Sequence, residues 1–539
     1  MFVLAIFLGI YTYGFFFFGL FGLLYGWIII LWTIFVLSLG FLISIPYLLK
    51  HFLKIRITNE ILKKIQNDNK IGLTLVLLLA LVLVNLIGVL GPETSFDALW
   101  YHLTFPKLYL QNHSITYIPG GLLYYSVMPK LGELLFVPAL FFGNEIIAKL
   151  LQYLFGILTT VVIFKISRRY FSLSLSLLAC LVFYSNIVVS WESTVAYIDL
   201  VRAFYETMTL WAFLIWSEKQ KRAWLYLSAI MLGFAISTKV LALGSLTIFT
   251  SLIVYLLIKK KKITVISLTT NILVYWYISI VVVVPWFLFS YFSTRNAFYP
   301  FFTPFYPVAS GQNIHALLSS FLDLFLFSHD PISPIYLIVL PLVIVFFSKL
   351  KSQHKIIGYY CLGSLIVWYI TPNTGGGRFI LPYLPAWSIL VIAILDQVKR
   401  QKILYRTVAI SIFLIAIVTT FYRGIANSRY IPVILGKETK QEFLTKHLDF
   451  SFGDFYDTDG YFKTHITDSD KVLLYGFHNL YYIDFSFVDA SWVKKGDRFT
   501  YIATQHTSLP KRFKQWQLVY ENPITFVKLY RNTKKQWIY

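Results

Sequence analysis

Charged residues are scarce in this chain, and their scarcity decides its class. Asp, Glu, Lys and Arg make up 13% of the 539 residues, whereas hydrophobic residues make up 58%. Soluble proteins carry about 25% charged residues, so a water-soluble core is excluded as the main architecture. The composition predicts an all-α polytopic membrane protein, because each helix that crosses a bilayer takes roughly 20 apolar residues.

Cysteine is scarcer still, and other familiar signals are missing. The two cysteines, Cys180 and Cys361, both lie in apolar runs, which excludes a disulfide framework and a cysteine metal site. No basic segment precedes the apolar N-terminus, so residues 1–49 are predicted to form two anchoring spans and not a cleaved signal peptide. No P-loop lysine follows the glycines at 375–377, and no Rossmann motif is visible.

Acidic residues are the rarer charged type, which gives a formal net charge of +22. The basic residues fall in short loops between apolar runs. This placement is typical of cytoplasmic loops in a membrane protein and not of a nucleic-acid-binding surface. We therefore expect contact with membrane lipids and none with nucleic acid.

The apolar runs predict about 13 transmembrane helices. They lie near residues 2–24, 26–49, 72–91, 146–164, 173–190, 203–216, 223–238, 241–258, 264–292, 335–348, 356–371, 380–395 and 403–422.

The loops between these runs differ strongly in charge. One set of alternate loops holds 23 basic residues and the opposite set holds 7. The richer set is expected to face the cytoplasm, which places the loop 50–71 inside. The loops 92–145 and 293–334 and the tail then face the exterior of a multi-pass protein.

The sequence is expected to contain three parts. Residues 1–71 hold the N-terminal anchoring spans and a cytoplasmic loop, and residues 72–422 form the main transmembrane domain. Residues 423–539 are predicted to form a small soluble, extracytoplasmic α/β domain. Its expected elements are strands at 471–475, 481–487 and 499–503, a hairpin at 519–530 and a helix at 439–448.

A few ionisable residues at the exterior ends of the spans are the candidates for chemistry. Asp97 opens the first exterior loop, where a carboxylate at the mouth of a membrane helix indicates function. Asp199 starts a later helix, and Arg202 and Glu206 follow it on the same helical face. The further candidates are Tyr101, His102, Glu133, Glu192 and Asn296.

Each candidate also has a plain structural role open to it. Asp97 would serve as the N-cap of the helix that follows it. Asp199 would form an ion pair within its own helix and interact with the helix dipole. The His102 ring would pack beneath the first loop, and Glu133 taken alone favours a structural role.

Two cations lie at the same membrane edge. Lys239 interrupts a long apolar stretch, and Arg378 follows Gly375, Gly376 and Gly377. Arginine binds phosphate in a bidentate manner, and glycines let the backbone approach a ligand closely. The alternative for Arg378 is a contact with lipid headgroups or with an acidic neighbour.

These segments resemble the GT-C superfamily of polyprenyl-phosphate-sugar-dependent glycosyltransferases, in the branch of protein O-mannosyltransferases and aminoarabinose transferases. The resembling pieces follow in the family's order over about residues 92–395. They are 97–103 with Pro106-Lys107, 129–133, 197–199, 233–239, 296–301 and 378–382.

The resemblance implies a GT-C-like fold and a glycosyltransferase of a prokaryotic plasma membrane. It implies that Asp97 is the catalytic base, that Asp199 or Glu192 organises the site, and that Arg378 and Lys239 bind the donor phosphate. The expected reaction moves a sugar, with inversion, from a polyprenyl-phosphate donor to a hydroxyl of a protein, lipid or glycan acceptor. A divalent metal ion is left open, with Asp97 and Asp199 as its ligands if it binds.

Two other functions remain as alternatives. A lipid or solute transporter or flippase would need polar residues near the middle of the spans, whereas these charges gather at the exterior ends. A membrane scaffold without enzymatic activity would leave the placement of the charges unexplained.

Overall fold

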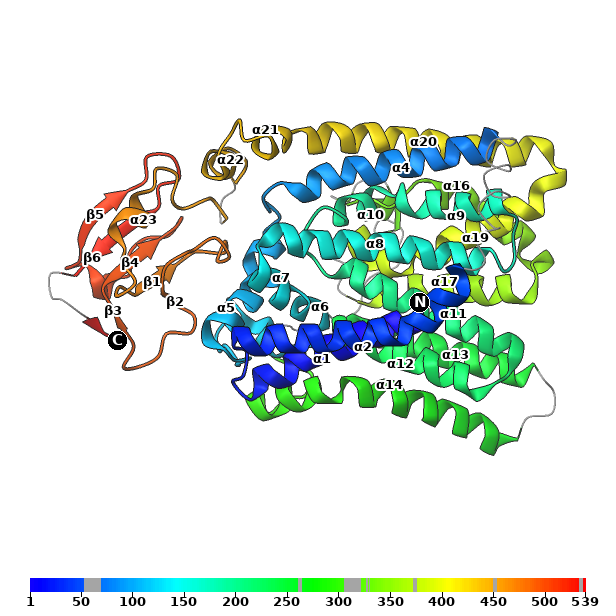
Figure 1. Cartoon of the computed structure of the whole chain (residues 1–539), viewed down its shortest axis with the longest axis horizontal. Coiled ribbons are helices and arrows are strands. Elements are labelled where there is room, and N and C mark those ends of the chain that lie inside the picture. The colour runs from blue at the N-terminus through cyan, green and yellow to red at the C-terminus, as the bar shows by residue number, and fades with distance from the viewer. Residues whose placement is uncertain are drawn as a thin grey trace.

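The computed structural model describes residues 1–52, 69–259, 264–304, 321–325, 328, 330–371, 376–448, 453–532 and 537–539. An elongated bundle of helices carries a small sheet domain at one end, here called the domain end (Figure 1). Three stretches named in the sequence analysis lie in part outside the described residues: 53–68 of the basic loop 50–71, Lys260 to Lys262, and 305–320, 326, 327 and 329 of the second exterior loop.

The predicted apolar runs coincide with helices. These are α1 Phe2–Leu20, α2 Gly26–Phe52, α4 Asn69–Leu90, α8 Glu145–Ser167, α9 Leu173–Tyr184, α11 Asp199–Lys219, α12 Arg222–Thr238, α13 Leu243–Ile258, α14 Val265–Thr294, α16 Ile335–Phe346, α17 Ser352–Ile370, α19 Leu384–Gln397 and α20 Lys402–Ser428. Within the described ranges, eight helices are long and apolar enough to cross a membrane, so the chain is a multi-pass membrane protein. The total of about 13 spans stays a prediction.

One predicted run is broken in the structure. Residues 173–190 form α9 and a separate short helix, α10 Ile187–Glu192. The break occurs at Asn186, whose side-chain oxygen accepts from the Ser333 N–H at 3.0 Å and whose amide donates to the Tyr336 hydroxyl at 3.2 Å. These bonds tie the break to the start of α16.

Short helices form the loops at the domain end. The segment between α4 and α8 folds into the π-helix η1 Ala98–His102, α5 Thr104–Asn112, the 3-10 helix η2 Tyr124–Val127, α6 Leu131–Leu134 and α7 Phe136–Phe142. Further short elements are η3 Val240–Ala242, η4 Phe347–Lys349, α18 Gly377–Ile380, η5 Leu381–Tyr383, η6 Val398–Arg400 and α21 Ile431–Ile434.

The C-terminal domain is a mixed sheet with small helices, as predicted. The strands β1 Val472–Tyr475, β2 Phe487–Asp489, β4 Tyr501–Thr504, β5 Gln517–Glu521 and β6 Lys528–Arg531 lie in the order β2-β1-β4-β6-β5. β1 is parallel to β2 and β4, and the β5–β6 hairpin is antiparallel. A separate pair joins β3 Arg498–Phe499 and β7 Trp537–Ile538, and the helices are α22 Lys440–His447, α23 Tyr461–His465 and η7 Lys511–Phe513.

The predicted strand at 481–487 is wrong, because its backbone binds the first loop instead of a neighbouring strand. The Tyr481 N–H donates to the Leu99 carbonyl at 3.1 Å. The Lys107 ammonium donates to the carbonyls of Tyr481, at 2.7 Å, and Ile483. These bonds dock the sheet domain directly onto the loop that carries Asp97.

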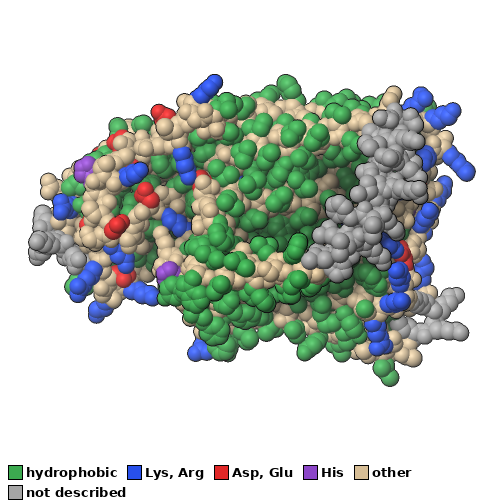
Figure 2. Space-filling model, in the orientation of Figure 1, with side chains coloured by type: hydrophobic (Ala, Val, Ile, Leu, Met, Phe, Trp, Pro, Cys, Tyr) green, Lys and Arg blue, Asp and Glu red, His purple; other side chains and the backbone are tan. Residues whose placement is uncertain are grey.

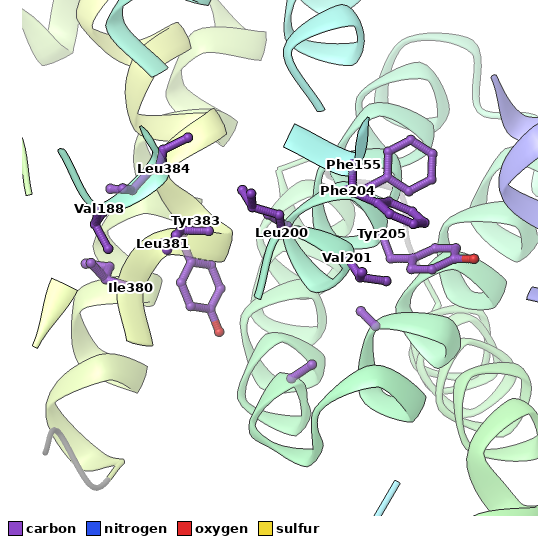
Figure 3. Close-up of a cluster of buried hydrophobic side chains, with 14 of the residues drawn as sticks. Phe155, Val188, Leu200, Val201, Phe204, Tyr205, Ile380, Leu381, Tyr383 and Leu384 are labelled. Atoms are coloured by element: carbon purple, nitrogen blue, oxygen red, sulfur yellow. The ribbon is translucent and has the colours of Figure 1, made fainter. Parts of the chain in front are cut away.

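The helix α11 lies in the centre of the bundle. Leu200, Val201 and Phe204 follow Asp199 on this helix, and Ile380 and Leu381 follow Arg378 on the facing segment, all of them buried (Figure 3). Between membrane helices, such side chains hold the elements together by close van der Waals packing. The apolar core thus fixes both helix starts from which the two charged side chains project.

The surface has the pattern of a membrane protein. Hydrophobic side chains cover the middle of the helical part, whereas Lys and Arg gather at the end far from the sheet domain and on that domain (Figure 2).

Candidate active site

Buried polar contacts hold the loop that leads to Asp97. The Lys149 ammonium donates to the carbonyls of Gly88 and Gly91, each at 2.8 Å. The Glu93 carboxylate accepts from the N–H groups of Ser95 at 2.8 Å and Ala196 at 2.6 Å. Because Glu93 binds backbone on both sides, it joins the start of the first loop to the segment just before Asp199.

Asp97 precedes the π-helix η1, but its side chain caps nothing. Its Oδ2 instead accepts from Arg378 Nη1 at 2.6 Å and from the Tyr101 hydroxyl at 3.0 Å. Burial alone would raise the pKa of Asp97, but the charge of Arg378 and these hydrogen bonds outweigh it and leave the pKa below its ordinary value. The carboxylate is therefore ionised at neutral pH.

Arg378 is the centre of the charged cluster. Its Nε donates to Asp199 Oδ2 at 3.1 Å and lies 3.8 Å from Glu192 Oε1. Its guanidinium stands over the Tyr197 ring, 4.5 Å from the centroid, an arrangement that favours a cation. The structure therefore shows the acidic-neighbour alternative for Arg378, with the carboxylates of Asp97, Asp199 and Glu192 as its neighbours.

The glycines before Arg378 serve its backbone. Gly376 has a φ of +54°, and a Cβ on Gly377 would lie 2.2 Å from the Asp330 carbonyl oxygen. The close approach lets Asp330 Oδ2 accept from the Arg378 N–H at 2.7 Å. In the described residues the glycines thus admit a protein loop and not a ligand, and Gly375 lies outside the described ranges.

Asp199 pairs across helices and not within its own. Its Oδ1 accepts from Lys239 Nζ at 2.7 Å, so Asp199 lies between Lys239 and Arg378. Arg202, expected as its helical partner, donates to Glu206 at 3.3 Å and to the Tyr383 hydroxyl at 2.8 Å. The predicted ion pair between Asp199 and Arg202 is therefore wrong, because the side chain of Arg202 extends toward the next turn of the helix.

The pair of Arg202 and Glu206 lies deeper in the bundle than the charged residues at the exterior ends of the spans. The Glu206 carboxylate also accepts from the Ser245 hydroxyl at 2.5 Å and the Tyr360 hydroxyl at 3.1 Å. Arg202 and Glu206 are completely buried. Breaking such a pair is costly because one charge is left uncompensated, so we assign it to the packing of the bundle.

His102 and Glu133 form a buried pair at the edge of the cluster. His102 Nδ1 lies 3.0 Å from Glu133 Oε1. Burial lowers the pKa of His102 despite the neighbouring carboxylates, so its ring is neutral at pH 7. Glu192 is also buried, and its Oε2 accepts from the Gln152 amide at 3.1 Å.

A cavity of about 340 Å³ joins most of these residues. Its charged and polar lining residues are Asp97, Tyr101, His102, Tyr125, Lys130, Glu133, Thr238, Lys239 and Arg378, and its apolar ones include Met128, Val240, Leu241, Phe301 and Phe379. Asp199 and Glu192 lie behind the two cations. An apolar wall with a few convergent polar groups is typical of a ligand site.

Asn296 lies outside this lining. Its amide donates to the Phe301 carbonyl at 2.9 Å, and its Oδ1 accepts from the Phe298 N–H at 2.9 Å. It therefore shapes the turn that brings Phe301 to the cavity wall.

The sequence left open a metal ion with Asp97 and Asp199 as its ligands. In the structure the Arg378 guanidinium donates to both of these carboxylates and lies between them. Across the part of the chain that the structure describes, His, Cys, Asp and Glu form no group of three suited to a metal ion.

The sequence reasoning missed three residues of this region. Glu93 lies in the first exterior loop and Tyr197 in the named segment 197–199, but neither was named as a site residue. Asp330 is an isolated acid just before a predicted span. The available signal for Asp330 was the same as for Asp97, a carboxylate at the mouth of a membrane helix.

Comparisons with known proteins agree with this fold. Residues 134–289 match the model of the family described as dolichyl-phosphate-mannose-protein mannosyltransferase. ArnT from Cupriavidus metallidurans in the apo state aligns with a TM-score of 0.58 and 14% identity, over 86% of this chain and 98% of that chain. The same protein bound to undecaprenyl phosphate aligns with a TM-score of 0.51 and 15% identity, over 85% and 97%.

The oligosaccharyltransferase of Archaeoglobus fulgidus in the apo form gives a TM-score of 0.47 and 12% identity, over 80% of this chain and 69% of that chain. A comparison of the sequence with curated proteins found no match. The predicted resemblance to the GT-C glycosyltransferases is confirmed by the family match and the ArnT fold. Asp199 and Lys239 lie inside the matched residues, whereas Asp97 and Arg378 lie outside them.

Proposed function

We propose that this protein transfers a sugar from a polyprenyl-phosphate donor to an acceptor hydroxyl, in the cavity at the domain end and on the exterior face of the membrane. One observation carries the proposal: Asp97 and Arg378 meet at 2.6 Å on the wall of one cavity that also holds Lys239. A base and two cations are the groups that such a transfer needs. The family match supports the same reaction class.

The two cations would bind the phosphate of the donor. Arg378 donates through Nη1 and Nε to carboxylates, and Lys239 carries three N–H donors, of which one reaches Asp199. A phosphate that enters the cavity would share these cations with the carboxylates. Asp199 and Glu192 then act as positioning residues, because they hold the two cations from behind.

Apolar residues beside the cations suit the prenyl chain. Val240, Leu241 and Phe301 line the cavity together with Lys239 and Arg378. A phosphate bound by the cations would thus have apolar side chains next to it. ArnT, whose fold this chain shares, has been crystallised with undecaprenyl phosphate.

The transfer is a single displacement at the anomeric carbon. The acceptor oxygen forms the new bond to this carbon while the bond to the phosphate oxygen breaks, so the configuration inverts. The proton of the hydroxyl passes to Asp97, and the polyprenyl phosphate leaves with its charge on Arg378 and Lys239. Charge stabilisation in a site with little water is usually the largest part of such catalysis.

Ionisation of Asp97 fits this role. Arg378 keeps the carboxylate charged at neutral pH, and the base must be charged to accept a proton. When the phosphate draws Arg378 toward itself, Asp97 loses part of its partner and becomes more basic. Donor binding would therefore prepare the base.

The test uses the purified full chain in liposomes with radiolabelled polyprenyl-phosphate hexoses, and it supplies protein, lipid and glycan preparations as sources of the acceptor hydroxyl. We expect polyprenyl phosphate to form, and we expect Asp97→Asn to lower its formation strongly. The matched control is Asp396→Asn, because this half-buried acid pairs with Lys399 at 3.2 Å and does not line the cavity. The proposal would be overturned if the labelled donor crossed the membrane without any cleavage. It would also be overturned if Asp97→Asn and Asp396→Asn had equal turnover.

A further inference from the structure

A second cavity lies next to the first and is built from both parts of the chain. It measures about 470 Å³ and is lined by Trp100, Tyr124 and Leu122 of the first loop and by His478, Asp489 and Ser491 of the sheet domain. Volumes of about 300–1,000 Å³ are typical of small-molecule sites.

The two cavities share one wall. Trp100 and Tyr124 line the second cavity, whereas the next residues along the chain, Tyr101 and Tyr125, line the first. The rings are neighbours across this wall, with centroids 5.7 Å apart for Trp100 and Tyr125 and 4.9 Å apart for Tyr101 and Tyr125. A ligand that fills the second cavity would thus lie one residue layer from the Tyr101 hydroxyl that binds Asp97.

The cavity also lies where parallel strands end. β1 and β2 are parallel, and their carboxyl ends lead into Gly476–His478 and into Asp489–Ser491. Ligands of open α/β sheets bind outside the carboxyl ends of the strands. This argument is independent of the first cavity, because it rests on the topology of the sheet domain alone.

The joint between the two parts is fitted closely. The Trp100 indole N–H donates to the Leu122 carbonyl at 3.1 Å, and the Leu122 N–H donates to the Ser491 hydroxyl at 3.3 Å. Gly120 has a φ of +97°, and a Cβ there would lie 1.9 Å from the Ser491 carbonyl oxygen. The sheet domain is therefore held at a fixed position against the wall.

The chemistry of the lining favours an uncharged polyhydroxylated ligand. Trp100, Tyr124 and His478 offer ring faces on which the apolar C–H face of a sugar can pack. Asp489 is 4% exposed, and its Oδ1 accepts from the Ser491 N–H at 2.8 Å. A carboxylate can accept more than one hydrogen bond, so Asp489 can also accept from hydroxyl groups of a ligand. Among the described residues that line this cavity none is Lys or Arg, so an anionic ligand is disfavoured.

We propose that this cavity binds the acceptor and that the acceptor is a glycan. The inference rests on the proposed function, since it names the acceptor class for that transfer. The reacting sugar would extend past the shared wall into the first cavity, while the rest of the glycan packs on Trp100 and Tyr124. A peptide is the other macromolecule that the sheet domain offers a place for, because β2 is an edge strand.

The test measures binding by the purified full chain in nanodiscs to an array of neutral and acidic oligosaccharides, beside an array of Ser- and Thr-containing peptides. We expect binding to neutral glycans. Asp489→Asn keeps the acceptor for the Ser491 N–H but lacks the charge, and should weaken the affinity about ten- to a hundredfold. Tyr124→Ala should weaken it as well, and Asp468→Asn, an exposed acid of the same domain, should not.

A parallel assay of donor cleavage separates the two proposals. With a glycan from the array, the KM for the glycan should rise in Asp489→Asn, whereas the KM for the donor should not change. Two outcomes would overturn the glycan inference and leave the proposed function standing. In one, the unaltered protein cleaves the donor but binds no glycan; in the other, it binds peptides alone. Glycan binding lost in Asp489→Asn without any donor cleavage would overturn the transfer and keep the cavity as a glycan site.

Discussion

Arg378 donates to Asp97 across 2.6 Å, although 281 residues separate them along the chain. The same guanidinium reaches Asp199 at 3.1 Å. One cation thus compensates two carboxylates at the domain end of the bundle, and any change at one of these residues alters the charge balance of the others.

Arg378→Ala should reduce donor turnover at limiting donor by about ten- to a hundredfold. The variant would lose charge-assisted bonds to the phosphate worth about 1.5–3 kcal/mol. Arg378→Lys should recover only part of the loss, because an ammonium lacks the planar fork. Steady-state kinetics against donor concentration measure the effect. Turnover of Arg378→Ala equal to that of the unaltered chain would move the phosphate to Lys239 or remove the donor assignment.

The same substitution should change the pH dependence. Arg378 lowers the pKa of Asp97, so its removal should raise that pKa. A base works only when ionised, and the acid side of the rate profile of Arg378→Ala should therefore shift to higher pH. Rates measured from pH 4 to 8 check this shift, and an unchanged acid side would show that Asp97 is not the titrating base.

Asp97→Asn should reduce sugar transfer by about 10²–10⁴-fold, the usual contribution of general-base catalysis. Asparagine keeps the shape of the side chain and caps helices about as well as aspartate, so a role in structure alone would leave activity nearly intact. The assay is transfer by the purified variant, with donor binding measured separately. Asp199→Asn is the comparison, and near-normal transfer by Asp97→Asn with loss in Asp199→Asn would identify Asp199 as the essential carboxylate.

Asp330 should give the activity a proton-dependent step near pH 6. Burial raises its pKa to about 6, although the Arg378 N–H and charge act to lower it. The ionised carboxylate is the stronger acceptor for that N–H, so kcat/KM should decrease as the pH falls through this value. Asp330→Asn should lack the step. A step of the same size in Asp330→Asn would assign it to another group, and His102 would be examined next.

The raised pKa has an opposite consequence for stability. The folded chain holds the Asp330 proton more tightly than the unfolded chain, so the contribution of this group to stability falls as the pH rises from the ordinary 3.8 to about 6 and is constant above. Thermal unfolding of the unaltered chain and Asp330→Asn at pH 4 and pH 7 would show the difference.

The orientation in the membrane can be tested by labelling. Single cysteines at Asn67 and Lys471 should react from opposite sides of sealed vesicles, because the basic loop 50–71 is predicted to be cytoplasmic and the sheet domain exterior. The native Cys180 and Cys361 are buried and should give little background. Labelling of both positions from the same side would contradict the exterior site.

The prediction of the helices succeeded because the bilayer simplifies the problem. A segment within lipid must satisfy its own backbone groups, so a run of apolar residues already implies a helix. The exception is the run 173–190, where Asn186 bonds to Ser333 and Tyr336 and ends α9. That break depends on residues about 150 positions away, and no local pattern contains them.

In the sheet domain too, local patterns predicted some elements, whereas distant contacts decided another. Its hairpin and the strand before it were recognisable from β-rich runs bounded by turn residues. The run 481–487 has equal β-propensity, yet Lys107 and Leu99 take its backbone groups. Competition between two partners for one backbone segment is decided by docking and not by propensity.

The sequence by itself determined that this is a polytopic membrane protein, and it named Asp97, Asp199, Lys239 and Arg378, because charges are expensive near lipid and stand out in apolar sequence. Only the tertiary structure decided which of them meet. Helical spacing favoured Arg202 as the partner of Asp199, but the packing of α11 against α12 and against η5, which follows α18, brings Lys239 and Arg378 to it instead. Asp330 and the second cavity also came from the structure alone, because they depend on contacts between segments that are distant along the chain.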